Sequence, residues 1–257
     1  MHNCRIFIKW LPVGIFCRSC ARLSKRGLYP LGVALLAGCL VSVARSDDLK
    51  SSSEEARFDI YVAGKEIGQE KFAVLASADS VSSSSILNFR DPGKKHQKVH
   101  IETQLDMDQE FLPRAYSLKL DVDGQKGAMD GKFVPGQAMF EYVGTGSSQK
   151  RGLLVGDRYT LLDSNVFHHF IFIARLFDLS SRKDSQSFEV VVPQEMDNGT
   201  LRIRELSMEK IEAQGKKRDL HRLRADSGQL QIDLWIDDHN ILYKIAIPNK
   251  KIEVIRN

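Results

Sequence analysis

Cysteine is scarce in this chain and is confined to one end of it. The four cysteines all lie within the first 39 residues: Cys4, Cys17, Cys20 and Cys39. If this segment is removed, the remaining protein has no thiol, which excludes a disulfide framework and a cysteine-based metal site. The stability of that protein must then come from the packing of its apolar residues.

Acidic residues are absent from the first 46 residues, and this changes the meaning of the positive net charge. Of the 37 Lys and Arg, seven lie in residues 1–46 and 30 in the rest of the chain, which holds all 33 Asp and Glu. The rest of the chain therefore has a net charge near −3 and no evident basic stripe. This distribution is not typical of a nucleic-acid-binding protein, which must neutralise phosphates.

The chain also lacks a segment that is long and apolar enough to suit a membrane-spanning helix. After Lys25 and Arg26 comes GLYPLGVALLAGCLVSVARSDD, an apolar core of signal-peptide length followed by small residues and then acids. A spanning helix needs about 20 apolar residues, and this core is shorter and is interrupted by Pro30 and glycines. Residues 1–46 are therefore predicted to be an export signal. A start codon assigned too far upstream would explain the long segment before Leu23.

Two kinds of cleavage site compete within the predicted export signal. Residues 36–39, LAGC, match a bacterial lipobox, in which Cys39 would carry a lipid and become the new N-terminus. The small residues at 42, 44 and 46 suit an ordinary signal peptidase instead. The first alternative predicts a lipoprotein attached to the cell envelope, and the second predicts a protein released into the periplasm.

Beyond the leader, apolar and polar residues alternate with a period of two. The alternation is clearest over residues 116–122, 230–236 and 241–247. Such runs predict half-buried β-strands with one face on a core and the other toward water. By this pattern we expect nine or ten strands, with no repeat of fixed period.

The connections between these runs have the composition of tight turns. Asp123-Gly124 is typical of a two-residue hairpin, because both of its positions need a positive φ. Pro135-Gly136, Asn198-Gly199 and residues 237–240 are predicted to be turns for similar reasons. Short connections favour antiparallel neighbours.

One segment, at about residues 165–178, has a helical period instead. Most of its circumference is apolar, and one face carries Val166, Phe170, Ile173 and Phe177. Asp163 or Ser164 can cap it through a side-chain oxygen. A helix that is apolar nearly all round is expected to lie buried against a sheet.

These features predict a mostly β protein. The fold we expect is a single curved antiparallel sheet or half-barrel wrapped around one central helix, at about 165–178. The polar, serine-rich residues 47–56 are predicted to be a spacer, and residues 57–257 a single β-rich domain.

Two adjacent histidines near the start of the helix are the first candidates for a site. Neighbouring helical residues diverge by about 100°, so His168 and His169 cannot bind one ion as an i, i+4 pair would. One interpretation is that they only contact polar groups at the first turn. The other is that His168 or His169, with Asp163 and Arg175, forms the polar end of an internal ligand pocket, with Phe172 as a further ligand-binding candidate.

Trp235 is the remaining ligand-binding candidate. In QLQIDLWID it falls on the same side as Gln231 and Asp233, opposite the apolar residues of the strand. It could touch a ligand in the concavity of a curved sheet or pack under the helix, and we favour packing. No residue pattern predicts a catalytic group, a metal site or a cofactor.

Two longer stretches carry a resemblance to known proteins. LDSNVFHHFIFIARLFD and the closing LQIDLWIDDHNILYKIAIPNKKIEVIR resemble the uncharacterised exported bacterial family called domain of unknown function 3108. The strand, LWID, turn and strand at the end are also similar to periplasmic lipoprotein-carrier (LolA-like) proteins, although the proline that often follows that turn is absent. The resemblance implies a curved sheet or half-barrel around a helix and brings no catalytic residue.

We therefore expect an exported, non-catalytic binding or carrier module of the periplasm or envelope. Its ligand would be apolar or amphipathic, such as a lipid or a lipidated partner, and it would meet the membrane only through a lipid on Cys39. One alternative is an envelope structural or assembly protein, which an exposed strand edge or apolar patch would favour. Another is a hydrolase that depends on His168 or His169.

Overall fold

The computed structural model describes residues 52–92, 97–181 and 183–257. The predicted export signal, with the lipidation candidate Cys39, lies outside these described residues. Part of the predicted spacer, residues 52–56, forms the start of the first strand. These residues pair with the next strand through their backbones, and backbone pairing needs no apolar side chain.

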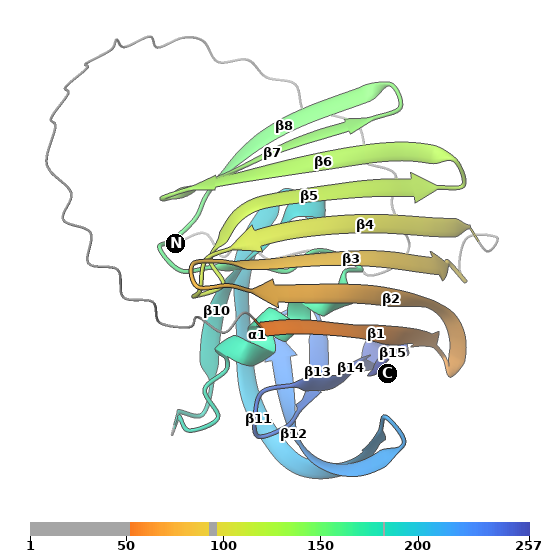
Figure 1. Cartoon of the computed structure of the whole chain (residues 1–257), viewed down its shortest axis with the longest axis vertical. Coiled ribbons are helices and arrows are strands. Elements are labelled where there is room, and N and C mark those ends of the chain that lie inside the picture. The colour runs from red at the N-terminus through yellow and green to blue at the C-terminus, as the bar shows by residue number, and fades with distance from the viewer. Residues whose placement is uncertain (1–51, 93–96, 182) are drawn as a thin grey trace, which may run out of the picture.

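One sheet of fifteen strands makes up most of the described chain (Figure 1). In chain order the strands are β1 (Ser52–Val62), β2 (Lys65–Ala76), β3 (Val81–Arg90), β4 (Lys98–Met107), β5 (Pro113–Val122), β6 (Gln125–Val134), β7 (Gln137–Gly144), β8 (Ser147–Leu154), β9 (Thr160–Leu161), β10 (Gln186–Val192), β11 (Asp197–Ala213), β12 (Lys216–Asp226), β13 (Gln231–Ile236), β14 (Leu242–Ile247) and β15 (Ile252–Arg256). Across the sheet their order is β8-β7-β6-β5-β4-β3-β2-β1-β15-β14-β13-β12-β11-β10-β9. Neighbouring strands are antiparallel except β9 and β10, which are parallel. Since β8 and β9 end the order, the sheet is not closed into a barrel.

A short helical segment lies inside the bend of the sheet. It begins with the 3-10 turn η1 (Phe167–His169) and continues as α1 (Phe170–Leu176). Figure 1 shows β1–β8 running across β10–β14, with α1 between the two halves. The predicted architecture, a mostly β protein with a curved sheet around one helix within residues 165–178, is confirmed. Within the described ranges no helix has the length and apolarity that crossing a membrane requires.

The space between the two halves is filled by side chains. One apolar cluster contains residues of both halves and of α1, and its fully buried aromatic members include Phe58, Phe140, Phe170 and Phe172. Burying an aromatic side chain stabilises the fold by roughly 1.5–3 kcal/mol. The helix therefore acts as the centre of the core.

The expected number of nine or ten strands was too low. Strand β8, with the sequence SSQKRGLL, exposes every residue except Leu153, so it has no alternation of apolar and polar residues. Strand β9 has two residues and is too short to show a period. Both strands form through backbone pairing at the ends of the sheet, which hydrophobic patterns do not report.

The turn predictions have mixed outcomes. Asp123 and Gly124 form the two-residue loop between β5 and β6 with φ of 51° and 88°, as expected. The prediction for Asn198-Gly199 was wrong, because both residues lie inside β11. The reversal before β11 is made by the 3-10 turn η2 (Pro193–Glu195) and by Met196, whose φ is 47°. Proline fixes φ at the start of that turn, and Met196 adopts the positive φ that glycine was expected to supply.

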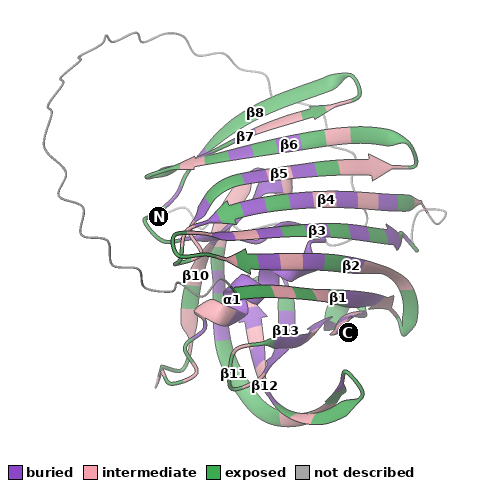
Figure 2. Cartoon of the chain, viewed as in Figure 1, coloured by how far each residue is buried: buried purple, intermediate pink, exposed green. Residues whose placement is uncertain are grey.

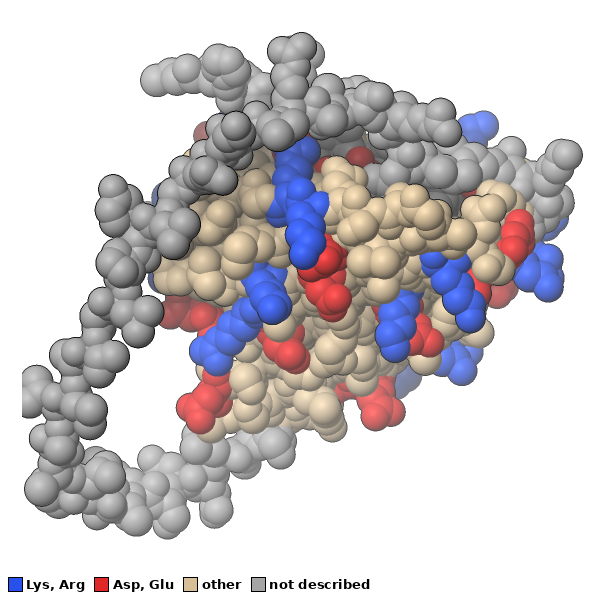
Figure 3. All heavy atoms as spheres, turned by 90° about the horizontal axis from the view of Figure 1, so that it is seen from above, with Lys and Arg blue, Asp and Glu red and all other residues tan. Residues whose placement is uncertain are grey.

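The outer surface of the sheet is polar. Figure 2 shows buried and exposed residues alternating along strands such as β3, as the period of two predicts. Figure 3 shows Lys and Arg interspersed with Asp and Glu on the face seen from above, with no stripe of one sign.

Gly68 provides a test of the close contact between β2 and β3. A Cβ at Gly68 would collide with the Asn88 carbonyl oxygen and lie 2.5 Å from Phe89 Cα. Because backbone atoms cannot rotate away, Gly68→Ala is expected to lower the free energy of unfolding by about 2 kcal/mol. Gly152→Ala on β8 is the control, since its Cβ would meet only the flexible Gln137 side chain. Urea unfolding measures both, and equal stability of the two variants would contradict the argument.

Candidate functional site

The carboxylate of Glu70 connects the sheet to the start of the helical segment. Glu70 lies on the inner face of β2 and is fully buried. Its Oε2 accepts hydrogen bonds from the backbone N–H groups of Phe167, at 2.9 Å, and His168, at 3.1 Å. The first N–H groups of a helix have no partner within the helix, so this distant carboxylate acts as the cap.

The predicted cap at Asp163 or Ser164 is therefore wrong. Residue Val166 stands at the N-cap position, and its side chain makes no capping hydrogen bond. Asn165, with a φ of 62°, turns the chain just before the helix. An acceptor on another strand does the capping, which reasoning from local sequence cannot detect.

His168 extends the contact between helix and sheet. Its Nδ1 lies 2.7 Å from Glu70 Oε1, and its Nε2 lies 3.4 Å from Ser83 Oγ on β3. The order serine, histidine, carboxylate is that of a hydrolytic triad. All three side chains are at most 1% exposed, so no substrate reaches Ser83 in this structure. Together these three side chains hold the helix against β2 and β3.

A second buried network surrounds Asp163. The hydroxyl of Tyr116 on β5 donates to Asp163 Oδ2 at 2.5 Å. Asp163 Oδ1 accepts from the backbone N–H groups of Ser164, at 2.8 Å, and Gln194, at 2.9 Å. Burial raises the pKa of Asp163 to about 6, although these hydrogen bonds act in the opposite direction. Asp163 thus joins β5, the helical segment and the turn before β11.

His169 stands between the two networks as a neutral ring. The Asp163 N–H donates to His169 Nδ1 at 3.1 Å, so that nitrogen acts as an acceptor. Within the described chain Nε2 is buried and has no hydrogen-bond partner. Burial, and secondarily the neighbouring His168, hold the pKa of His169 well below its usual value. A buried proton donor without a partner costs roughly 1–3 kcal/mol.

The structure brings four of the predicted site residues together. Asp163, His168 and His169 form the networks above, and the Phe172 ring packs edge-on to His168 with centroids 6.3 Å apart. Arg175 lies at the other end of the helix, where it pairs with Glu54 of β1. That these residues contact a ligand stays a prediction.

Trp235 lies on the opposite face of the sheet from the helix. Its strand neighbours Leu234 and Ile236 belong to the core around α1, whereas Trp235 belongs to a second apolar cluster. The interpretation that it packs under the helix was wrong. It packs instead beneath the β11–β12 hairpin, which contributes Ala213 and Leu220 to that cluster. The hairpin is bent enough to cover its own sheet, which the sequence pattern did not indicate.

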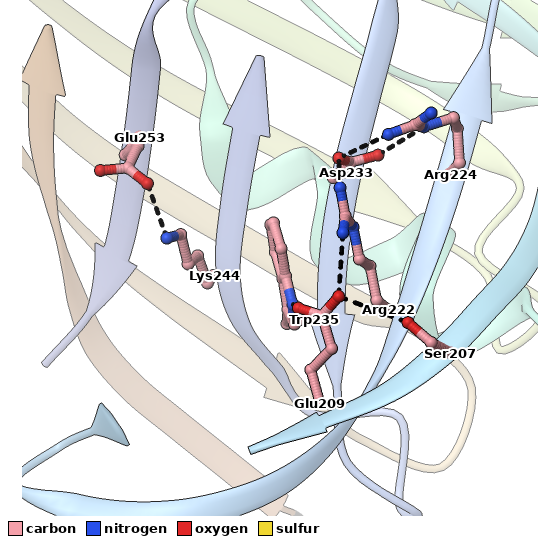
Figure 4. A network of polar contacts seen from close by, with 8 residues as sticks. All are labelled: Ser207, Glu209, Arg222, Arg224, Asp233, Trp235, Lys244 and Glu253. Atoms are coloured by element: carbon pink, nitrogen blue, oxygen red, sulfur yellow. Dashed lines mark hydrogen bonds and ion pairs between the residues drawn. The ribbon is translucent and has the colours of Figure 1, made fainter. Parts of the chain in front are cut away.

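A network of charges encloses Trp235 (Figure 4). Its Nε1–H donates to Glu209 at 2.9 Å, and Arg222 and Lys244 lie 5.3 and 5.1 Å from its ring centre. The hydrogen bonds from Trp235 and Arg222 lower the pKa of Glu209. Because its faces and its donor are used internally, Trp235 has a structural role in this arrangement.

Asp233 neutralises the arginines of this network. It accepts hydrogen bonds from Arg222, at 2.7 Å, and from Arg224, at 2.8 and 3.0 Å. Burial alone would raise the pKa of Asp233, but these hydrogen bonds outweigh it and hold the pKa below its usual value. Arg222 and Arg224 are thus both paired with Asp233, while the buried Nε of Arg222 has no hydrogen-bond partner among the described residues.

Two hollows of the described chain are large enough for a ligand and are open to solvent. One, of about 860 Å³, lies on the outer face of β1–β5 and is lined mainly by short or charged side chains. The other, of about 600 Å³, is called the mouth hollow here and lies where the helix ends, against the β4–β5 turn, β9 and β10. Its apolar lining is Phe111, Leu112, Tyr159, Leu176 and Phe188. The mouth hollow combines an apolar lining with a few polar groups, as ligand sites do.

The mouth hollow is continuous with the core. The Phe111 ring lies 5.6 Å from the ring of fully buried Phe172. The Arg175 guanidinium, which pairs with Glu54, lies 5.9 Å from the centre of the Phe111 ring. Phe111 has a φ of 61°, which is uncommon for a bulky residue. The predicted ligand residues Phe172 and Arg175 are therefore neighbours of the hollow, while the two histidines are not among its lining residues.

Sequence reasoning missed Glu70, Ser83 and Gln194. The signal for Glu70 was present, because it shares strand parity with Phe72 and Val74 and so was a charged residue on an apolar face. Ser83 alternates in the same way with Val81. Gln194 acts through its backbone N–H and through its side-chain amide, which donates to the Ser164 carbonyl at 2.7 Å, and a glutamine in a turn gives no signal of such contacts.

Comparisons with known proteins give distant structural likenesses and no family. No family model matches the chain, and no curated protein matches it by sequence. A β-barrel-like protein of domain of unknown function DUF1849 from Brucella abortus is similar at 9% identity and a TM-score of 0.49, covering 79% of this chain and 95% of that one. A DUF1089 family protein from Pseudomonas aeruginosa is similar at 10% identity and a TM-score of 0.45, covering 70% of this chain and 90% of that one.

A third solved structure is more distant. A presumed exported protein with a YmcC-like fold from Bacteroides fragilis is 6% identical with a TM-score of 0.21, covering 79% of this chain and 92% of that one. At such identities the likeness concerns the β-rich fold alone. The resemblance to family 3108 and to lipoprotein carriers stays a prediction.

Removal of the Glu70 carboxylate should destabilise the whole fold. Glu70→Ala leaves two buried N–H groups and His168 without their acceptor, and we expect a loss of about 3 kcal/mol or more in the free energy of unfolding. Glu66→Ala, at an exposed position of the same strand, should change it by less than about 0.5 kcal/mol. Chemical denaturation followed by far-ultraviolet circular dichroism measures both variants. Similar small losses for the two would contradict the capping role.

We expect His169 to lower the free energy of unfolding in acid. Its pKa is lowered in the folded state, so its contribution is present above about pH 6.5 and is lost as pH falls toward the folded pKa. The unfolded chain then binds one more proton than the folded chain, a slope of up to about 1.4 kcal/mol per pH unit. Asp163 opposes this below about pH 6, because its pKa is raised.

His169→Asn removes the titrating ring and leaves Asp163 in place. Unfolding free energies from urea titrations at pH 7.5, 6 and 5 should fall less steeply in this variant than in the wild type. The difference between the two slopes isolates the histidine, whatever the absolute stability of the variant. Parallel pH profiles would show that His169 is not held neutral.

Proposed function

We propose that this protein is an exported, non-catalytic binding module of the periplasm or envelope, and that the mouth hollow takes an apolar or amphipathic ligand. The observation that carries the proposal is the hollow itself, about 600 Å³ in volume and lined by three aromatic and two leucine side chains. Ligand sites commonly have about 300–1,000 Å³ and this kind of lining. The proposal concerns a class of ligand and leaves its head group open.

The interior of the sheet supports a site at the mouth rather than around the helix. Phe140, Phe170 and Phe172 are fully buried there, so a ligand would have to displace packed core residues. In this proposal Asp163, His168 and His169 hold the helix in place. Leu176 and the ring of Phe111 then form the wall that the ligand meets.

An assembly protein is a second candidate, favoured by one edge of the sheet. Strand β8 is exposed along nearly all of its length, and its Leu154 and the neighbouring Val143 of β7 are 84% and 52% exposed. Exposed edges and apolar side chains favour contacts with other chains. Lys150 and Arg151 on β8 oppose this, because charges on an edge strand discourage pairing.

Phe188→Glu tests the mouth hollow. Nile red, a neutral apolar dye, should bind the wild type with increased fluorescence. The carboxylate that this substitution places in the hollow should weaken this binding about tenfold or more, because a loss of about 1.4 kcal/mol in binding free energy is tenfold in Kd. Leu154→Glu is the matched control, because it adds the same charge at an exposed position on β8. Circular dichroism should confirm that both variants fold.

Two outcomes would contradict the proposal. Absence of Nile red binding to the folded wild type would remove the apolar site. Equal weakening by Phe188→Glu and Leu154→Glu would place the dye elsewhere and favour the exposed β8 region, which is the assembly alternative.

A further inference from the structure

One wall of the mouth hollow is an incompletely paired strand edge. Strand β9 has two residues, and they pair only with Val190 and Val191 of β10. Residues 186–189 of β10 therefore have one neighbouring strand, β11, among the described residues. Three of them, Ser187, Phe188 and Glu189, line the mouth hollow.

The direction of the backbone groups at this edge follows from one hydrogen bond. Leu162 N–H donates to the Val191 carbonyl at 3.0 Å, so the backbone of Val191 faces away from β11. Along a strand alternate residues face the same side, which turns the backbone groups of Glu189 and Ser187 to the outer edge as well. An added strand could pair with Ser187 while its side chains enter the hollow.

The charges around the hollow select among peptides. The charged lining residues are Glu110, Asp157, Arg158 and Glu189. Arg158 pairs with Glu110 at 3.2 Å, which leaves Asp157 and Glu189 as the excess. Glu189 accepts from Gly156 N–H, and this contact leaves its charge in place. The nearby Arg175 is directed to Glu54. The rim is therefore acidic and complements a basic ligand.

We infer that the mouth hollow binds an extended polypeptide segment that pairs with the free edge of β10, placing apolar side chains in the hollow and basic side chains near Asp157 and Glu189. This rests on the proposed function and names the chemistry of its ligand. Edge-strand addition derives affinity from backbone hydrogen bonds and specificity from pockets for alternate side chains, and both elements are present here.

The test uses defined peptides with the full chain. A fluorescein-labelled decapeptide of alternating Lys and Val should bind in fluorescence anisotropy titrations. The matched Glu and Val decapeptide should bind at least about tenfold more weakly because of the acidic rim. The Lys and Val peptide with N-methyl groups on every second amide keeps its side chains and loses strand pairing, and it should also bind at least about tenfold more weakly.

Variants of the chain locate the peptide. Ser187→Pro removes an N–H from the outer edge, where proline is tolerated, and should weaken peptide binding while Nile red still binds. Asp157→Lys should weaken binding of the basic peptide about tenfold. Asp130→Lys, at an exposed position of β6 outside the lining of the mouth hollow, is the matched control and should leave binding unchanged.

The outcomes separate this inference from the proposed function. If Nile red binds and depends on Phe188 but the peptide does not bind, or the N-methylated peptide binds equally well, strand pairing is overturned and the apolar site remains. If neither Nile red nor any peptide binds, the proposed function itself fails. Loss of peptide binding in Ser187→Pro with retention of Nile red supports both.

Discussion

The fold depends on one buried carboxylate that acts across the chain. Glu70 of β2 accepts hydrogen bonds from the first free amides of the helical segment and from His168, almost a hundred residues later in the sequence. Without it, the start of the helix would bring unsatisfied N–H groups into an apolar core. Because Asp163 ties the same segment to β5 and to Gln194, the helix is fixed on several sides of the bend.

This anchoring explains why the interior and the rim have different roles. A helix held by charged and polar groups and surrounded by fully buried aromatic rings leaves no room for a ligand beside it. At its C-terminal end Arg175 pairs with Glu54 of β1, and Leu176 beside it lines the open mouth hollow with Phe111 and Phe188. In the outer network, Trp235 donates to Glu209 and Arg222 donates to Asp233, so these groups are paired within the chain.

Much of the fold follows from the sequence, while most of the site does not. Alternation predicted the strands, Asp123-Gly124 predicted its hairpin, and helical period located α1, because these are local properties. The cap, the partners of the histidines and the surroundings of Trp235 depend on strands that are distant in sequence. Glu70 was nevertheless visible as a charge on an apolar strand face, and such a residue is a useful signal of a buried partner.

Native mass spectrometry of the full-length protein exported into a periplasm tests the central claim most directly. The wild-type protein should show a discrete excess mass that disappears on denaturation, and Phe188→Glu purified in the same way should lack it. Retention of the same excess mass by Phe188→Glu, together with its loss in Leu154→Glu, would place the ligand at the β8 edge and contradict a site in the mouth hollow.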